Sequence, residues 1–296
     1  MPSTAWTTLW MTMHDHTELT QDRIGHLKER LEREITQKIC PLDVTAWQAP
    51  GEPVSFEEAV VANYRPFPPG TWWGAPWSTW WLHVTGTLPE GHAGDEIDLS
   101  MDLGFVGDWA GNQSEAMVYT SSGRPLKALN PRNHRVALNH GALVQRFADE
   151  GEPLIGTDGG VELWVEAAGN PDMTLHLGGP TELGDRRTAG NEPLWQFKGA
   201  ELSVRRKEVW DLWLDIDVLD GLMRQLPADS THRARLLHGL EQAADVVDHH
   251  GILAGARRAR DILAGYLDSG ANSSAQQMTA IGHAHIDSAW LWPLRE

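Results

Sequence analysis

The sequence predicts a mixed, mainly β fold, in which an antiparallel β-sandwich follows one helix and precedes three more. Between residues 41 and 207, short apolar runs are separated by glycine, proline, asparagine and aspartate, which is typical of strands joined by irregular loops. Before and after that region, apolar residues recur at helical spacing. A β-prone run at residues 280–287 then ends in alternating histidine and aspartate, which indicates one more strand.

The N-terminal part is interpreted as a leader over residues 1–16, with Met1, Met11 and Met13 as alternative starts, and a helix over residues 17–40. Thr20 has a side chain suited to an N-cap. The apolar positions that would form the buried face of this helix are spaced three or four residues apart: Ile24, Leu27, Leu31 and Ile35. The helix is expected to end near Cys40.

The β-sandwich is assigned to residues 41–207. Its predicted strands lie at residues 80–86, 96–101, 116–119, 161–166 and 200–204. Two of them, 96–101 and 161–166, alternate apolar and polar residues, as half-buried strands do. Turn-forming residues stand between the strands, and several short strands with irregular loops favour two packed antiparallel sheets.

A helical connector is predicted over residues 208–270. Apolar periodicity indicates helices at residues 209–222, 236–247 and 253–266. The stretch at 227–230 should end the first helix and cap the second. A polar linker follows at residues 269–277, before the last predicted strand.

Composition excludes some classes of partner. The chain has 296 residues, with 24 basic and 41 acidic side chains and a formal charge of −17. That charge opposes binding to nucleic acid or to anionic membranes. A single cysteine, Cys40, permits no internal disulfide and fits a reducing cytoplasm. Neither a signal-peptide pattern nor an apolar run of about 18 residues is present, so a cytoplasmic location is expected.

The candidate site lies in the last predicted strand. Because alternate residues of a strand share a face, His283, His285 and Asp287 would project together. Imidazole and carboxylate suit a divalent ion such as zinc, and the indole of Trp290 could stack on a sugar. Three interpretations are open: ordinary strand residues, a hydrolase whose metal activates water, or a glycosidase whose metal grips sugar hydroxyls.

Tryptophan is unusually frequent, with 15 copies against 3 tyrosines and 5 phenylalanines. Most of these indoles are expected in the core. Three of them lie close to Gly74: Trp72 and Trp73 precede it, and Trp77 follows it. If these indoles are exposed, they could instead bind a pyranose ring. Core or interface packing is the favoured interpretation for these three.

The segment GHAHIDSAWLWPLRE (282–296) resembles the opening motif of the catalytic domain of glycoside hydrolase family 38, the α-mannosidases, in their cytosolic-type branch. Segments of the β region also resemble that branch: PWSTWW (76–81), LKALNPR (126–132), VEAAGNP (165–171) and LG (183–184). The likeness runs from about residue 13 to residue 296. The motif is highly specific in this context, whereas the β segments are less so individually.

The resemblance implies an N-terminal fragment of a retaining α-mannosidase that acts on mannosides or free manno-oligosaccharides as a cytoplasmic homo-oligomer. Zn²⁺, or Co²⁺, would be held in part by His285 and Asp287. Trp290 would stack under the sugar, and His283 would orient the site without binding the ion. Residues 271–296 would begin a (β/α) barrel. The family's nucleophile and remaining ligands would lie beyond residue 296, so this chain alone should be inactive.

Two other classes of function remain open. One is a non-catalytic carbohydrate-binding or assembly module, formed by the β-sandwich. The other is a fragment of an amidohydrolase-type metallohydrolase, which shares a His-x-His strand end but leaves the β segments unexplained.

Overall fold

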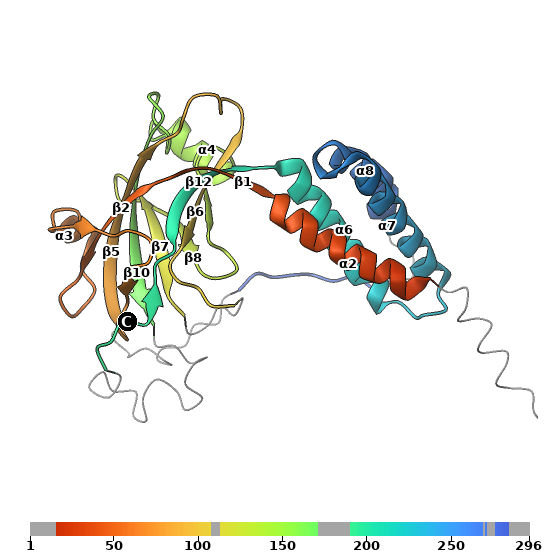
Figure 1. The fold of residues 1–296 in the computed structure, drawn as a ribbon, viewed down its shortest axis with the longest axis horizontal. Coiled ribbons are helices and arrows are strands. Elements are labelled where there is room, and N and C mark those ends of the chain that lie inside the picture. Colours follow the sequence, from red (N-terminus) through yellow and green to blue (C-terminus); the bar gives the residue numbers. More distant parts are fainter. Residues whose placement is uncertain (1–15, 108–112, 171–189, 269, 271–275, 284–296) are drawn as a thin grey trace, which may run out of the picture. The chain divides into compact units, whose positions relative to one another are not determined.

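A computed structural model describes residues 16–107, 113–170, 190–268, 270 and 276–283. The chain divides into two compact units, drawn in Figure 1. The β unit contains residues 38–204, and the helical unit combines the residues up to 37 with residues 205–281. Within the described residues, no helix has the length and apolar character required to cross a membrane.

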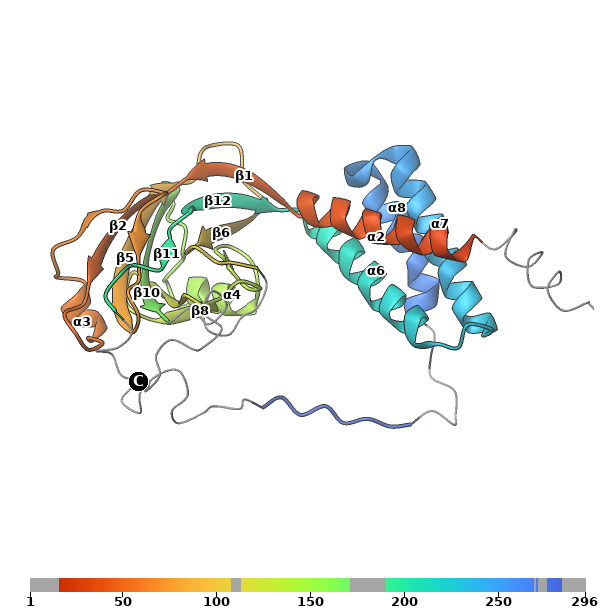
Figure 2. The same ribbon diagram turned by 60° about the horizontal axis from the view of Figure 1, so that its bottom comes forward.

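The β unit contains a six-stranded sheet and a four-stranded sheet, in the orders β3-β2-β5-β10-β7-β8 and β1-β12-β6-β9. The strands of the larger sheet are β2 (Asp43–Gln48), β3 (Arg65–Pro66), β5 (Ser78–Thr87), β7 (Glu115–Thr120), β8 (Pro125–Leu129) and β10 (Gly160–Gly169). Those of the smaller sheet are β1 (Thr36–Pro41), β6 (Glu96–Asp102), β9 (Arg135–Ala137) and β12 (Gly199–Arg205). A short ribbon pairs β4 (Trp72–Trp73) with β11 (Trp195–Gln196). Figure 2 shows the two main layers.

The core of the β unit lies between these layers. β5 and β10 pair antiparallel along ten residues each, from Thr87 opposite Gly160 to Ser78 opposite Gly169. Alternate residues of the two strands enter the core, including Leu82, Val84, Leu163 and Val165, because strand side chains alternate between faces. Burying such side chains is the main stabilising term for the sandwich. The predicted antiparallel β-sandwich is therefore confirmed.

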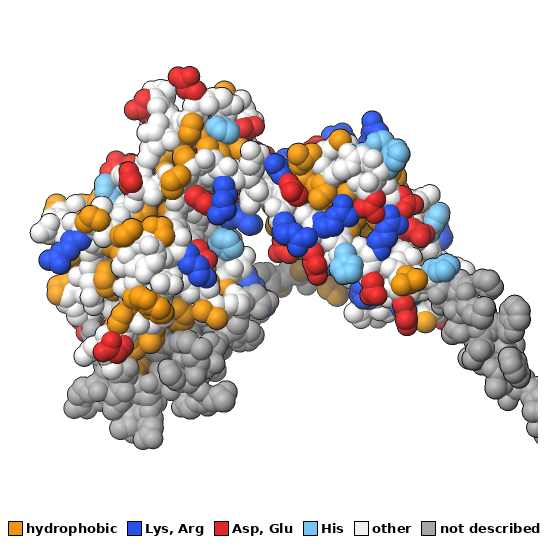
Figure 3. Space-filling view, in the orientation of Figure 1, with side chains coloured by type: hydrophobic (Ala, Val, Ile, Leu, Met, Phe, Trp, Pro, Cys, Tyr) orange, Lys and Arg blue, Asp and Glu red, His pale blue; other side chains and the backbone are white. Residues whose placement is uncertain are grey.

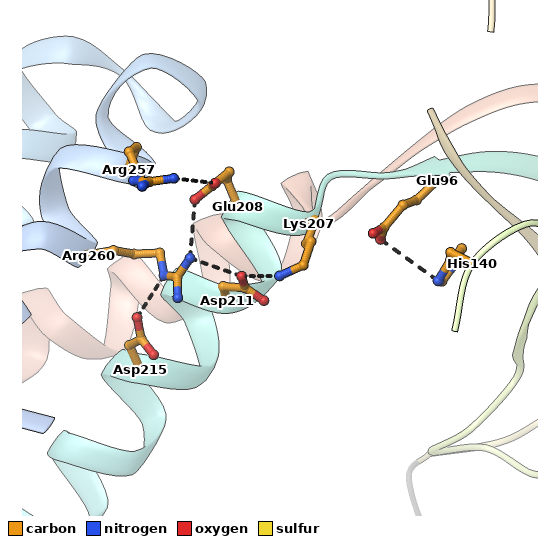
Figure 4. A network of polar contacts seen from close by, with 8 residues as sticks. All are labelled: Glu96, His140, Lys207, Glu208, Asp211, Asp215, Arg257 and Arg260. Carbon is orange, nitrogen blue, oxygen red and sulfur yellow. Dashed lines mark hydrogen bonds and ion pairs between the residues drawn. The ribbon is translucent and has the colours of Figure 1, made fainter. Parts of the chain in front are cut away.

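Smaller elements close the sandwich. The helix α4 (Ala142–Asp149) contributes Val144 and Phe147 to the core. Just before it, His140 bonds to Asp98 of β6 through Nε2 (2.7 Å), and its Nδ1 lies 3.8 Å from Glu96 (Figure 4). On the opposite face of the larger sheet, the single-turn helix α3 (Phe56–Ala59) begins with a capping box between Ser55 and Glu58.

In the helical unit, α2 (Thr17–Glu34) packs against α6 (Lys207–Gln225) and α7 (Thr231–His250), and α8 (Ile252–Leu267) packs against the same two helices. Its core is formed mainly by leucine, isoleucine and alanine: Ile24, Leu27, Leu31, Leu212, Ile216, Leu236, Leu240, Ala256 and Leu263 among them. Gly239 of α7 permits a close approach of α8, because a Cβ there would lie 2.5 Å from the Tyr266 ring. Segments predicted separately, as an N-terminal helix and a helical connector, thus share one core.

Ion pairs cover the outside of this unit. Arg260 of α8 bonds to Asp215 (2.9 Å), Asp211 (2.9 Å) and Glu208 (3.2 Å) of α6 (Figure 4). The hydrogen bond to Asp215 raises the pKa of Arg260. Partial burial opposes this shift, and the other two carboxylates reinforce it. Figure 3 shows basic and acidic side chains interspersed over the helical unit.

Two details of the predicted N-terminal helix are wrong. α2 ends at Glu34 rather than near Cys40, and Thr36–Pro41 form the strand β1. The apolar spacing continues through Ile35, which is buried in the helical core, but hydrogen bonding to β12 extends the chain beyond it. The helix also begins at Thr17, so Thr20 is not its cap; the Thr20 hydroxyl donates to Glu241 of α7 (3.5 Å).

The three later helices and five strands are found where predicted, with ends that differ by a few residues. Ser230 caps α7, and its side chain accepts a hydrogen bond from the backbone N–H of Arg233. Hydrogen bonding to neighbouring strands forms further strands whose sequences show no strong alternation of apolar and polar residues. These include β1, β2, β8 and β9.

Candidate functional site

Of the predicted metal-site residues, His283 alone lies within the described part of the chain. It is exposed, in a segment at residues 276–283 that has no regular secondary structure. Met278 and Ile281 beside it are also exposed, at 92% and 79%. A strand requires a hydrogen-bonded neighbour, and the three sheets include none of residues 276–283. The strand expected there is therefore not formed as far as residue 283.

His285, Asp287 and Trp290 lie outside the described residues. Among the residues that are described, no group of three His, Cys, Asp or Glu side chains could hold a metal ion. The metal site is therefore still a prediction, based on the motif.

Of the ten tryptophans that the structure describes, five are buried, all of them in the β unit, and four more are partly buried. Trp73, Trp77, Trp81, Trp164 and Trp195 are buried. Of the three indoles considered for sugar binding, Trp73 and Trp77 are thus core residues, and Trp72 is 57% exposed. Trp73 also uses its indole N–H, which donates to the carbonyl oxygen of Leu103 (2.8 Å).

Two of the segments that resemble α-mannosidases meet in the structure. The backbone N–H of Trp77 donates to the carbonyl oxygen of Gly169 at the end of β10 (2.7 Å). Gly169 is required at this contact, because a Cβ there would lie 2.7 Å from the carbonyl oxygen of Ala75. Trp77 itself adopts a φ of 57°, which is unusual for a bulky residue. The two segments therefore form one structural feature of the β unit.

An aromatic cluster covers the outer face of the larger sheet under α3. Trp81 stacks on Tyr119, with ring centroids 5.5 Å apart, and meets Phe56 of α3 edge to face at 5.9 Å. Burial, with help from the nearby Glu166, raises the pKa of Tyr119 to about 12. Its hydroxyl donates to Glu166 (3.0 Å). Because α3 covers Trp81, which is 1% exposed, that ring cannot receive a ligand.

One histidine joins the edge of this cluster. The His83 ring stacks on Trp164, with centroids 4.0 Å apart and planes 13° apart. Its Nε2 lies 2.9 Å from Glu162 on the neighbouring strand β10. The ring stack and the contact with Glu162 fix the His83 ring in place, and we interpret both as structural.

A groove of about 500 Å³ opens where β2, β3 and β5 meet. Its lining includes aromatic and polar side chains: Trp47, Gln48, Asn63, Arg65, Phe67 and Trp80. The volume lies in the range of small-molecule sites. Trp80 and Phe67 touch at 5.9 Å between ring centroids, and Phe67 is buried.

Sequence reasoning missed this groove. It considered Trp72, Trp73 and Trp77, because they lie close to one another around a glycine. The groove is assembled instead by strand pairing, in which Gln48 is opposite Trp80 and Ala46 is opposite Arg65. A signal was available in the predicted strand at 80–86, whose first residue is an indole, but its polar partners lie elsewhere in the sequence.

Comparison with protein families gives a match over residues 40–203, to the family described as "Alpha-mannosidase, jelly roll domain". This range covers most of the β unit, from the end of β1 through most of β12. The family assignment and the observed two-layer antiparallel fold agree.

Two curated relatives extend the similarity. Alpha-mannosidase 2C1 of Homo sapiens is 26% identical over 261 residues, which cover 87% of this chain and 22% of the relative. Alpha-mannosidase 2C1 of Mus musculus is 25% identical over 288 residues, which cover 97% of this chain and 25% of the relative. The chain thus spans no more than a quarter of the length of either relative. With the family match over residues 40–203, the resemblance to α-mannosidases is confirmed, and the chain belongs to the family of α-mannosidase jelly roll domains.

Proposed function

We propose that this chain is the N-terminal part of a retaining, metal-dependent α-mannosidase that hydrolyses terminal α-D-mannosyl residues. The observation that carries the proposal is the match of residues 40–203 to the α-mannosidase jelly roll family. The similarity of nearly the whole chain to α-mannosidases supports it. The full enzyme would act on mannosides or free manno-oligosaccharides in the cytoplasm, as a homo-oligomer.

The proposed metal site uses the motif near residue 285. His285 and Asp287 supply an imidazole nitrogen and a carboxylate oxygen, a donor set that suits Zn²⁺ or Co²⁺. When bound, the ion would contact hydroxyl groups of the mannosyl ring. Trp290 would place its ring under the sugar, and His283 would hold the neighbouring groups in orientation.

Two ligands make a weak site, because stable protein sites for such ions use three or four. The nucleophile, the acid/base and the remaining ligands are proposed to come from polypeptide beyond Glu296. The 296 residues alone should therefore hydrolyse no mannoside, and the β unit would serve as an accessory domain.

Hydrolysis of para-nitrophenyl α-D-mannopyranoside tests this proposal. A polypeptide that continues past Glu296 should turn the substrate over, and the 296-residue chain should not. In the longer polypeptide, His283→Ala should lower kcat/KM by about 10- to 100-fold, and His285→Ala and Asp287→Ala should lower it further. His232→Ala, which removes an exposed histidine of α7, is the matched control and should have no effect.

Proton NMR of the first-formed mannose tests the stereochemistry, because a retaining enzyme releases the α-anomer. Initial release of the β-anomer, or full activity in Asp287→Ala, would contradict the mechanism. Complete lack of mannoside hydrolysis by the longer polypeptide would contradict the function. That last result is what the amidohydrolase-type alternative predicts, and no observation on the described residues favours it.

A further inference from the structure

The groove between β2, β3 and β5 has a rigid aromatic wall. Trp80 is half-buried, and its ring is fixed by Phe67 on one side (5.9 Å, 38° between planes) and by Trp73 on another (6.2 Å, 76°). An indole held in this way loses little conformational entropy when a ligand stacks on it. The wall is therefore preorganised for a flat apolar surface.

Strand register places polar side chains on the same side as this ring. Gln48 is directly opposite Trp80, and residues directly opposite each other in an antiparallel pair share a face. Arg65 is opposite Ala46, the residue two positions before Gln48. Because alanine is small, the space between Arg65 and Trp80 is left open. The groove is thus a direct result of the β2–β3 and β2–β5 pairings.

Three polar side chains of the groove have no partner among the described residues. Gln48, Asn63 and Arg65 are exposed, and among the residues that the structure describes none of their side chains makes a hydrogen bond or an ion pair. They offer two amides and one guanidinium, which together carry both donors and acceptors. The lining contains a single basic side chain and no acidic one, so it suits a neutral polar ligand.

We propose that this groove binds a pyranose ring of a neutral mannoside, with the C–H face of the sugar on Trp80 and its hydroxyls on Asn63, Arg65 and Gln48. The choice of mannose rests on the proposed function. A hydroxyl both donates and accepts, as a side-chain amide does, and the groove volume of about 500 Å³ accommodates one or two sugar rings.

A peptide occupant is less well matched. Peptides that bind to sheet edges add a strand through backbone hydrogen bonds. The edge strand here, β3, consists of Arg65 and Pro66, and proline has no N–H to donate. An anion is also less well matched, because Arg65 is the sole basic side chain of the lining and the chain carries a net charge of −17.

The test is an NMR titration of the isotope-labelled 296-residue chain with methyl α-D-mannopyranoside and with an α-linked mannobiose. The indole N–H signal of Trp80 is assigned by its loss in Trp80→Phe. We expect this signal to shift saturably, and the disaccharide to bind more tightly than the monosaccharide. Asn63→Ala and Arg65→Ala should each weaken binding by roughly fivefold, the effect of losing one hydrogen bond; both positions are exposed, so folding should be preserved.

The matched controls are Asn133→Ala and Trp72→Ala, which change exposed residues of the β unit that do not line the groove. Both should bind the sugar with unchanged affinity. No saturable shift, equal weakening by Asn63→Ala and Asn133→Ala, or tighter binding of inorganic phosphate or of an unstructured peptide would overturn the proposal. The hydrolysis test is independent of this one, because Asp287→Ala should abolish turnover in the longer polypeptide and leave the Trp80 titration unchanged.

Discussion

The two units of this protein differ in how far apart their elements lie in the sequence. The sheets of the β unit lie within the continuous stretch 38–204 apart from the first residues of β1, and long antiparallel pairings such as β5 with β10 border its core. The helical unit joins α2 to three helices that follow the whole β unit in sequence. Closing so long a loop has an entropic cost, so α2 must be held by strong burial. Leu27 and Leu31 of α2 are accordingly almost fully buried.

The charged side chains of the helical unit also contrast with the polar side chains in the groove of the β unit. In the helical unit, charged residues from different helices pair with each other, as Arg260 does with Asp211 and Asp215. In the groove of the β unit, Asn63 and Arg65 are exposed, and within the described structure their side chains have no partner. Paired charges contribute to assembly, whereas polar groups without partners are available to a ligand. The exposed polar groups are the basis for the sugar site proposed in the groove of the β unit.

The largest loss of stability is expected when the aromatic cluster on the outer face of the β unit is disrupted. Trp81→Ala removes a ring that is 1% exposed and packs on Phe56 and Tyr119. It should lower the free energy of unfolding by about 4 kcal/mol, the range for a buried tryptophan, as measured by urea denaturation. The matched change, Trp72→Ala, removes an indole that is 57% exposed and should have an effect below about 0.5 kcal/mol. Equal effects would show that the cluster under α3 is not a packed core.

The next largest loss of stability should follow from a change in α2, and it tests whether the helical unit depends on this helix. Leu31→Ala, at a fully buried position, should destabilise that unit by about 3 kcal/mol. Amide exchange should become faster in α6, α7 and α8 and stay slow in β5 and β10. Leu214→Ala, at a position of α6 that is 43% exposed, should change little. Faster exchange in both units to the same extent would mean that they unfold together.

A smaller effect concerns the helix caps. Ser230 accepts from the backbone N–H of Arg233 at 3.5 Å, and Ser55 accepts from that of Glu58 at 3.3 Å. Each serine-to-alanine change should cost about 1 kcal/mol locally. Ser230→Ala should lower the thermal midpoint of the helical unit, because α7 spans 20 residues. Ser55→Ala should increase amide exchange in α3 alone, and a lowered midpoint of the helical unit in that variant would contradict the division into units.

The smallest effect is a pH dependence in the helical unit. Asp248 binds Arg30 and Arg23, each at 2.7 Å, and these bonds outweigh burial and hold the pKa of Asp248 below its ordinary 3.8. Because the folded-state pKa is lowered, the stabilisation is present above pH 3.8 and is lost as the pH falls through the lowered value. Asp248 is 38% exposed, so the contribution should stay below about 1 kcal/mol.

Asp248→Asn should therefore lower the thermal midpoint slightly at neutral pH, and the difference from wild type should disappear well below pH 3.8. Asp229→Asn, at an exposed loop position before α7, is the control and should show no such convergence. A difference that persists in acid would assign the effect to packing and not to charge.

Much of this fold could be predicted from local sequence. The strands at Glu96–Asp102 and Gly160–Gly169 follow from alternation, and α7 follows from apolar spacing and the cap at Ser230. Local patterns did not predict β1, because Ile35 continues the helical spacing while hydrogen bonds to β12 extend the chain. Tertiary pairing overrode the local signal there.

The candidate sites could be predicted to different extents. The metal-site hypothesis arises from residues adjacent in sequence, so the motif can be recognised in the amino-acid sequence alone. The groove could not be predicted, because Gln48, Arg65 and Trp80 are brought together by strand register. The exposure of a side chain could not be predicted from its residue type either. Trp72 is 57% exposed, whereas its neighbour Trp73 is fully buried.

We propose that this chain supplies two ligands of a metal site, His285 and Asp287, and that polypeptide beyond Glu296 completes the site. The direct measurement is the metal content, after dialysis, of the 296-residue chain beside a polypeptide that continues past Glu296. We expect about one Zn²⁺ or Co²⁺ per longer polypeptide, lost in Asp287→Ala, and no retained metal in the shorter chain. Tight metal binding by the 296 residues alone, or a longer polypeptide that hydrolyses mannosides with no metal bound, would contradict it.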